Sequence, residues 1–164
     1  MRAARVNIVV NVSDARSSGD PGDVIVTYSL GSCIGVCLYD AQAGVAGMLH
    51  YQLPTSTMDA GRAAEKPCMF ADTGMAVLLG QMEALGAVKK RMKVKLAGGA
   101  AMLNDAGTFN IGKRNHAAIR KILWQQGMFI QAEEVGGTQS RDVYLRVADG
   151  ELTIKSDRPT VSAA

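Results

Sequence analysis

The chain contains 164 residues, of which 48% are hydrophobic and 20% are charged, and its 18 Lys and Arg residues exceed its 15 Asp and Glu residues by three. This length predicts one domain with a single hydrophobic core, and this composition excludes a largely disordered chain. A net charge of +3 is too small to indicate nucleic acid as a partner.

No segment predicts membrane insertion or export. The most apolar uncharged window lies between Asp23 and Asp40 and is 16 residues long, whereas a membrane-spanning helix needs about 20 apolar residues. Near the start, Asn7 and Asn11 confine the apolar stretch to residues 8–10, which is too short for a secretory signal. Three cysteines, an odd number, favour a reducing compartment over a disulfide framework. We therefore expect a cytoplasmic protein.

The first third of the chain predicts β-strands. Apolar and β-branched residues predict strands over residues 6–12, 23–28, 33–39 and 45–51. The polar stretches 13–22 and 55–66 are expected to be a turn and an exposed loop. A short polar turn joins the third strand to the fourth, so these two are expected to form a hairpin that ends before Pro54.

The remainder of the chain mixes helices with strands. Apolar residues at helical spacing predict two helices, over 71–85 and 113–126, each followed by a glycine. Further strands are predicted over residues 92–96, 128–135, 143–147 and 152–154. The last two of these strands flank an Asp149-Gly150 turn, which is typical of a hairpin.

These elements predict an α+β fold, a sandwich of mixed β-sheets flanked by two main helices, in preference to a doubly wound parallel sheet. One domain is expected over residues 1–164, with its core over about 5–155. The tail, 157–164, is expected to be frayed.

A cysteine follows a glycine-containing turn between two predicted strands. In such a turn, backbone N–H groups can point into a cleft beside the thiol of Cys33, so Gly31 and Ser32 are candidates for an oxyanion-binding turn. A cysteine nucleophile also needs a base. In the predicted hairpin His50 lies roughly opposite Ser32 and Cys33, where facing Cβ atoms are about 4.5–5.5 Å apart. His116 lies on a predicted helix and has no comparable route to the thiol.

The alternative role for Cys33 is that of a small buried hydrophobic residue, which is the commoner role of a cysteine in an apolar strand. Cys37 and Cys68 are expected to be core or surface thiols. Along a strand Cys33 and Cys37 lie about 13 Å apart, too far for a disulfide or a shared metal. The chain also has no C-x-x-C or H-x-x-x-H spacing of a zinc site. No metal or organic cofactor is expected, because a thiol and an imidazole supply covalent and acid–base catalysis.

Other glycine-containing segments have structural explanations. Residues 107–113 match G-x-x-x-x-G-K, but Arg114 stands where a nucleotide-binding loop needs Ser or Thr to hold Mg²⁺, so a helix start is the better interpretation. Gly98-Gly99 and Gly136-Gly137 are expected to form tight turns or to allow close backbone approach. Arg141 is expected to be a solvated charge rather than a contact for a partner.

Several short motifs occur in a fixed order along the chain. They are Thr27-x-x-Leu30-Gly31-Ser32-Cys33, Cys37-Leu38-Tyr39-Asp40, His50-Tyr51-Gln52-Leu53-Pro54, Lys95-Leu96-x-Gly98-Gly99-Ala100, Ile111-Gly112-x-Arg114-Asn115 and Val135-Gly136-Gly137. This set resembles the CheD family of bacterial chemoreceptor glutamine deamidases, over about residues 5–155. Its most specific part is L-G-S-C followed by H-x-x-L-P seventeen residues later. Thr138 departs from the pattern, since asparagine is expected after the Gly-Gly pair.

The resemblance implies roles for three residues. Cys33 would be the nucleophile, His50 the general base, and Thr27 the residue that orients the imidazole. The implied fold is the sandwich shared with bacterial cytotoxic deamidases of the cytotoxic necrotizing factor type. The implied substrates are glutamine side chains on the cytoplasmic helices of chemoreceptors, and the implied regulatory partner is the phosphatase CheC.

Two other interpretations stay open at this point. One is a non-catalytic adaptor that binds such a phosphatase or a receptor, and intact Thr27, Cys33 and His50 argue against it. The other is a different cysteine hydrolase on the same scaffold, which would differ only in its substrate.

Overall fold

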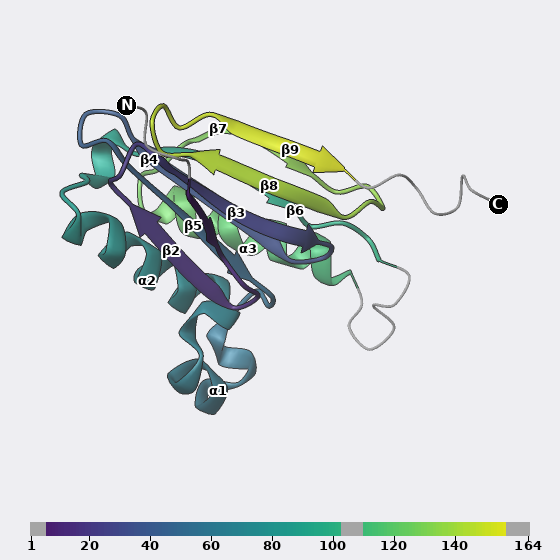
Figure 1. The fold of residues 1–164 in the computed structure, drawn as a ribbon. Coiled ribbons are helices and arrows are strands. Elements are labelled where there is room, and N and C mark those ends of the chain that lie inside the picture. Colours follow the sequence, from purple (N-terminus) through teal and green to yellow (C-terminus); the bar gives the residue numbers. More distant parts are fainter. Residues whose placement is uncertain (1–5, 103–109, 157–164) are drawn as a thin grey trace.

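Two packed β-sheets with helices against one of them form the core of the computed structural model, which describes residues 6–102 and 110–156 (Figure 1). The four-stranded sheet has the order β1 (Val6–Val9), β3 (Asp23–Leu30), β8 (Arg141–Arg146), β9 (Leu152–Ser156). The five-stranded sheet has the order β2 (Asp14–Ser18), β5 (Val45–Tyr51), β4 (Ile34–Asp40), β6 (Lys93–Gly98), β7 (Ile130–Val135). The α-helices are α1 (Ala60–Glu65), α2 (Ala71–Ala84) and α3 (Ile111–Gln125), and the 3-10 helices are η1 (Ser56–Met58), η2 (Pro67–Met69) and η3 (Lys89–Arg91).

The expected α+β class with mixed sheets is confirmed. β1 pairs with β3, and β6 pairs with β7, in parallel, while the other neighbouring strands are antiparallel. Two helices longer than ten residues, α2 and α3, lie against the five-stranded sheet. Among the described residues no helix is long and apolar enough to cross a membrane.

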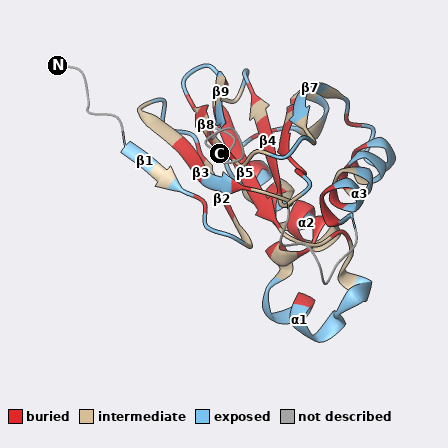
Figure 2. Ribbon diagram, turned by 90° about the vertical axis from the view of Figure 1, so that its right-hand side faces the viewer, coloured by how far each residue is buried: buried red, intermediate tan, exposed pale blue. Residues whose placement is uncertain are grey.

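The five-stranded sheet lies in the middle of the molecule, so its two faces contact different cores. One face packs on α2 and α3 through a cluster that includes Val36, Leu49 and Met75. The other face packs on the four-stranded sheet through a cluster that includes Ile25 and Met48. Every residue of β5 is therefore buried, and Figure 2 shows the buried residues concentrated in the central strands and on the inner side of α2.

Strand alternation decides which core each side chain of the middle sheet enters. Leu49 and Tyr51 of β5 belong to the helix side. Met48 belongs to the side between the sheets. His50, two residues after Met48, therefore also faces the space between the two sheets.

Three expectations for the first third of the chain are corrected. The stretch predicted as a turn over 13–22 contains β2, an edge strand whose apolar content is a single alanine, so it has no hydrophobic alternation to detect. Its partner β5 holds it, together with Gln81 of α2, which accepts from the Ser17 hydroxyl and donates to the Ala15 carbonyl. The predicted loop over 55–66 contains η1 and α1, which begin after side-chain caps from Thr55 and Asp59. In the β4–β5 hairpin His50 pairs with Gly35, not with Ser32 or Cys33.

The other predicted elements are confirmed within a few residues of their expected bounds. α2 is followed by Gly86 at φ +97 and α3 by Gly127 at φ +70, a left-handed conformation that favours glycine at a helix end. Gly150 at φ +73 lies in the turn between β8 and β9. Residues 107–109 of the G-x-x-x-x-G-K pattern and the predicted tail over 157–164 lie outside the described residues. The rest of the pattern contains the N-cap Asn110 and the first residues of α3, so the expected helix start is confirmed.

Candidate active site

A hydroxyl and an imidazole meet in the space between the two sheets. Thr27 of β3 is 0% exposed and His50 of β5 is 1% exposed. The Thr27 Oγ1 and the His50 Nδ1 lie 2.8 Å apart. The Thr27 hydroxyl also donates to the backbone carbonyl of Val10 at 2.7 Å. The Thr27 side chain therefore connects the histidine of one sheet to the segment that follows β1.

These two contacts assign the proton on the imidazole. A hydroxyl has one hydrogen, and the Val10 carbonyl can only accept, so the Thr27 hydroxyl donates its hydrogen to Val10. The Thr27 oxygen must then accept from His50, which places the ring hydrogen on Nδ1. The lone pair of the neutral ring is consequently on Nε2, the position from which His50 can act as a base.

The second ring nitrogen of His50 is buried and has no hydrogen-bond partner within the described part of the chain. Burial lowers the pKa of His50 from 6.5 to about 4, and the negative charge of the nearby Asp14 offsets only part of this effect. The imidazole is therefore neutral at pH 7. An unpaired basic nitrogen in a buried place is costly to maintain in a fold, and such groups are enriched in active sites.

Cys33 lies just before β4 and faces the same space as His50. It is half-buried and packs on the cluster between the two sheets. His50 is paired with Gly35, two residues after Cys33, so the cysteine and the histidine are diagonal neighbours on one face. A Cβ at Gly35 would lie 3.0 Å from Leu30 Cδ1, so the Leu30 side chain packs over this glycine. The sequence prediction thus placed the two residues on the correct face with a register error of about two residues.

Three carbonyls of the turn that contains Cys33 are held by different elements. The Gly31 carbonyl accepts from the Ala100 amide at 2.9 Å, and the Cys33 carbonyl accepts from the Gly99 amide at 2.9 Å. The Ser32 carbonyl accepts from the Asn115 side chain at 3.0 Å. Since C=O and N–H point in opposite directions across a trans peptide, the amides of Ser32 and Cys33 point away from the groups that hold the carbonyls.

The glycine pair after β6 allows this close contact. Gly98 has φ +108, and a Cβ at this position would lie 2.2 Å from the Cys33 carbonyl oxygen. Any side chain there would displace the turn of Cys33. The expectation of close backbone approach at Gly98-Gly99 is therefore confirmed, and the segment that approaches is the one that contains the cysteine.

Arg141 is not the solvated charge that the sequence suggested. It is 7% exposed, and its guanidinium donates to the carbonyls of Gly98 at 3.1 Å and Gly136 at 2.9 Å and to the carboxylate of Glu134 at 2.9 Å. Arg141 thus braces both glycine pairs from behind. Five N–H donors in a fixed plane suit this task, whereas sequence patterns give no sign of which backbone carbonyls a distant arginine will reach.

The comparisons with known proteins identify the family of the chain. A family model described as "CheD chemotactic sensory transduction" matches residues 52–156. A probable chemoreceptor glutamine deamidase CheD of Solibacter usitatus is 47% identical over 150 residues, which cover 92% of this chain and 89% of that protein. The chemoreceptor glutamine deamidase CheD of Thermotoga maritima is 37% identical over 147 residues, 90% of each chain. The chain belongs to the CheD family.

The resemblance seen in the motifs is thereby confirmed, while the roles of single residues in this CheD family member depend on the geometry. The family match begins at Gln52, so Thr27, Cys33 and His50 lie before it. A crystal structure of a Neisseria meningitidis protein aligns at a TM-score of 0.44 and 12% identity, covering 81% of this chain and 63% of that one. That likeness is too weak to support an argument.

The other thiols and the second histidine lie elsewhere in this CheD chain. Burial, only partly offset by Lys95, raises the pKa of Cys37 from 9.0 to about 12. Burial and the charge of Asp14 raise the pKa of Cys68 to about 11. His116 of α3 is paired with Glu133 of β7 at 2.7 Å. Neither thiol lies in the thiolate form at neutral pH, and His116 is ion-paired, so none of the three resembles the buried, unpaired Nε2 of His50.

Asn115 is a buried residue that sequence reasoning quoted within a motif but gave no role. Its side-chain NH₂ group donates to the carbonyl of Ser32 at 3.0 Å and to that of Gln52 at 2.8 Å. One side chain of α3 therefore ties the turn of Cys33 to the strand end after His50. The Tyr51 hydroxyl in turn donates to the Asn115 carbonyl at 2.6 Å. Asn115 is the third residue of the helix predicted over 113–126, within its first turn, and nothing in the sequence pattern indicates that its side chain reaches two distant carbonyls.

Proposed function

We propose that this chain is a protein-glutamine glutaminase that converts glutamine side chains of chemoreceptors to glutamate. The names of its relatives support the reaction and the substrate. The observation that carries the mechanism is the neutral His50, held by Thr27 in the tautomer that leaves Nε2 basic. A non-catalytic adaptor would have no use for such a buried base.

The first half of the reaction forms a thioester. The Nε2 atom of His50 accepts the thiol proton of Cys33 as the sulfur attacks the glutamine Cδ, and the carbonyl oxygen becomes an oxyanion. In this proposal the backbone amides of Ser32 and Cys33 stabilise this charge. When the oxyanion collapses, the C–N bond breaks and the imidazolium donates its proton to the departing ammonia.

The second half regenerates the enzyme. His50 accepts a proton from a water molecule as the water oxygen attacks the thioester carbon. Collapse of this second oxyanion breaks the C–S bond, and the proton returns to the sulfur of Cys33. The sum is one amide plus one water to give one carboxylic acid and one ammonia, and thiol and imidazole supply all the acid–base chemistry.

Burial of His50 favours the step in which its imidazolium acts as an acid. A pKa of about 4 makes the imidazolium a strong proton donor, which favours protonation of a poor leaving group. The hydrogen bond from Nδ1–H of His50 to Thr27 fixes the orientation of the imidazole ring. The Thr27 oxygen also faces the positive charge when the ring is protonated, so Thr27 stabilises that state.

The resemblance to the CheD family supports two finer parts of the proposal. The substrate glutamines would lie on the cytoplasmic helices of receptors, which would place the enzyme at receptor arrays. A CheC-type phosphatase would bind the enzyme and regulate it.

The test is incubation of a chemoreceptor cytoplasmic fragment with the protein, followed by mass spectrometry of its peptides and assay of ammonia. Wild type should convert particular glutamines to glutamates with one ammonia each. Cys33→Ala should release none, because no other group can form the thioester, and Cys68→Ala serves as the matched thiol control. Ammonia release by a folded Cys33→Ala variant would rule out the mechanism.

A further inference from the structure

Two large aromatic side chains project from the surface at the C-terminal end of α3. Trp124 is 80% exposed and Phe129, just before β7, is 84% exposed. They line a hollow between α3 and β7, together with Leu123, Met128 and Ile130. We call this hollow the α3–β7 groove. Aromatic residues exposed to this extent and grouped around a hollow are typical of an interaction site.

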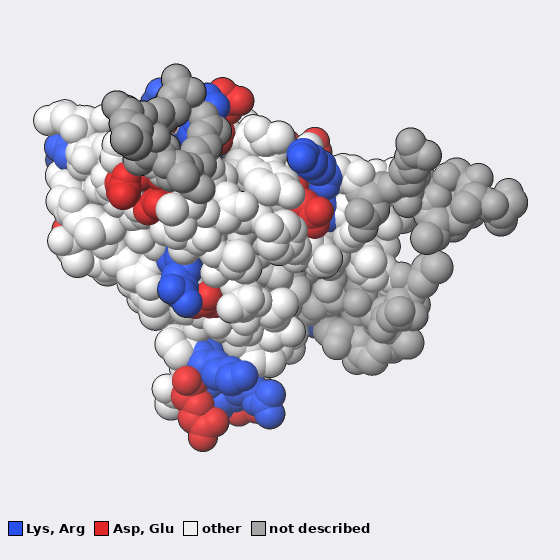
Figure 3. Space-filling model, in the orientation of Figure 1, with Lys and Arg blue, Asp and Glu red and all other residues white. Residues whose placement is uncertain are grey.

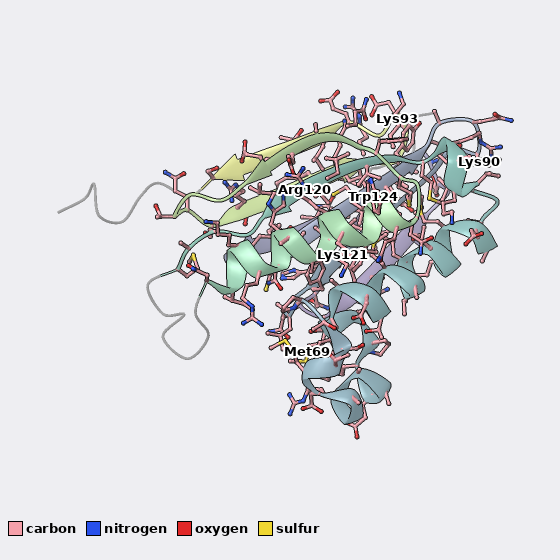
Figure 4. The ribbon with its side chains drawn as sticks, turned by 180° about the vertical axis from the view of Figure 1, so that it is seen from behind. Met69, Lys90, Lys93, Arg120, Lys121 and Trp124 are labelled. Carbon is pink, nitrogen blue, oxygen red and sulfur yellow. The ribbon has the colours of Figure 1, made fainter. Side chains whose placement is uncertain are left out.

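Unpaired positive charges surround the α3–β7 groove. Arg120 and Lys121 of α3 line it, and Lys90 and Lys93 line the adjoining hollow that shares Phe129 with it. All four are exposed, and none of them forms an ion pair within the described residues. Figure 4 shows these four cations on the same side of the molecule as Trp124.

Negative charge does not balance this surface. Glu133 lines the α3–β7 groove and is paired with His116, and no described carboxylate lines the adjoining hollow. On the face drawn in Figure 3, by contrast, Lys and Arg side chains lie next to Asp and Glu. A chain whose net charge is only +3 thus places several unpaired cations around two exposed aromatic rings.

The α3–β7 groove is separate from the candidate active site. Asn115, which holds the turn of Cys33, lies nine residues before Trp124 on α3, a distance of about 13 Å at the rise of an α-helix. A substrate that reaches both places must therefore be extended and must follow α3. Long helices of a receptor have such a shape.

We propose that the α3–β7 groove docks an acidic, partly apolar helical segment of the protein substrate, away from the glutamine that reacts; this rests on the proposed function. Carboxylates of the segment would face Lys90, Lys93, Arg120 and Lys121, and an apolar side chain would enter the hollow between Trp124 and Phe129. The apolar floor of the hollow, formed by Leu123, Met128 and Ile130, suits a ridge of apolar side chains on a helix, and the cations at its rim suit carboxylates beside that ridge. The groove therefore contributes to substrate binding and leaves the chemical step unchanged.

The test measures binding of a chemoreceptor cytoplasmic fragment in the Cys33→Ala background, where the fragment is not converted. Lys90→Glu/Lys121→Glu should raise Kd about five- to ten-fold at about 50 mM NaCl, and this difference should shrink at about 300 mM NaCl because salt screens exposed charges. The control Arg62→Glu/Lys66→Glu makes the same change in net charge on two exposed cations at α1, and should leave Kd within about two-fold. Trp124→Ala should weaken binding about ten-fold or more, and Trp124→Phe should restore most of it.

With Cys33 intact, the groove variants should raise KM and leave kcat within about two-fold, as expected when binding remote from the reacting atoms is lost. Equal Kd values for the groove and control variants would overturn the docking proposal. The proposal would also be overturned if the groove variants bound the fragment like wild type but lost sedimentation with phosphatidylglycerol vesicles. The same holds if they bound the fragment like wild type but lost dimerisation. Groove-dependent binding without any ammonia release would sustain the docking site and refute the proposed function.

Discussion

A single hydroxyl hydrogen determines how His50 can react. Thr27 donates it to the Val10 carbonyl, so the imidazole must keep its own hydrogen on Nδ1. Valine, which has the same shape as threonine, would fill the same space but would not fix the ring hydrogen on Nδ1. The role of Thr27 is therefore chemical and not only a matter of packing between the sheets.

Replacement of Thr27 separates the hydroxyl from the shape of the side chain. Thr27→Val should lower kcat about ten-fold, the worth of one lost hydrogen bond of roughly 1.4 kcal/mol, because Nε2 is then no longer held as the basic nitrogen. Thr27→Ser keeps the hydroxyl and should retain most of the activity. The measurement is ammonia release at saturating receptor fragment. Equal rates for the two variants would show that the hydroxyl does not act through His50.

The loss at Thr27 should be smaller than the loss at His50 itself. His50→Asn should lower kcat by about 10²–10⁴-fold, the range for general acid–base catalysis. The double variant Thr27→Val/His50→Asn should be no worse than His50→Asn alone, since residues that act as a unit have non-additive effects. Additive losses would place Thr27 outside the catalytic unit.

The three cysteines should differ in reactivity toward iodoacetamide at pH 7. Cys37 and Cys68 are buried, with pKa values raised to about 12 and about 11, so almost none of either thiol is the reactive thiolate. Cys33 is half-buried and faces His50, and it should be alkylated first. Peptide mapping after brief labelling measures the order, and preferential labelling of Cys68 would contradict it.

At the scale of elements, α3 reaches across the molecule to fix the distance between two strands. Its Asn115 side chain donates to the Ser32 carbonyl, in the turn before β4, and to the Gln52 carbonyl, just after β5. The Cys33 turn is held on its other side by the glycine pair after β6, which Arg141 of β8 braces. Four elements therefore set the position of one thiol.

Removal of the Asn115 donors should affect both stability and chemistry. Asn115→Ala leaves two part-buried carbonyls unpaired, so the free energy of unfolding should fall by about 1–3 kcal/mol. Asn115→Asp keeps the shape but loses the NH₂ group, so it should lower kcat as much as Asn115→Ala does. Urea unfolding and ammonia release measure the two effects, with Gln125→Ala at the exposed end of α3 as control.

The readout that separates positioning from stability is the alkylation rate of Cys33 at a urea concentration where both proteins are fully folded. It should change in Asn115→Asp and stay the same in Gln125→Ala. An unchanged rate and kcat in a destabilised Asn115→Asp would limit this residue to a structural role.

At the scale of the whole molecule, burial of a few polar groups makes the fold sensitive to acid. The unfolded chain binds a proton on His50 with a pKa of 6.5, and the folded chain does so only at about 4. Asp40 behaves differently: burial raises its pKa, but bonds from Arg91, Val88 and Ala43 outweigh this and lower it from 3.8 to about 2. In each case the unfolded chain binds more protons below the unfolded pKa, so acid favours unfolding.

Two separate pH windows of instability follow. The contribution of His50 is fully present above pH 6.5 and is lost as pH falls toward about 4, a loss of roughly 3 kcal/mol. The contribution of Asp40 is present above pH 3.8 and is lost toward pH 2. His50→Gln should therefore flatten the free energy of unfolding between pH 6.5 and 4.5, and Asp40→Asn should not. Urea titrations at several pH values measure this, and a wild-type slope in His50→Gln would contradict the buried neutral histidine.

The sequence by itself determined most strands, both long helices, the α+β class and the position of Cys33 next to the hairpin that carries His50, because hydrophobic periodicity and turn residues act over short distances. Its family motifs singled out Thr27 as well. Only the tertiary structure decided that Gly35 faces His50, that the edge strand β2 forms without an apolar face, and that Asn115 and Arg141 hold backbone carbonyls far away in the sequence. These features depend on register and on contacts between sheets and helices, where the partner of a polar group is chosen by the packed fold and has no pattern along the chain.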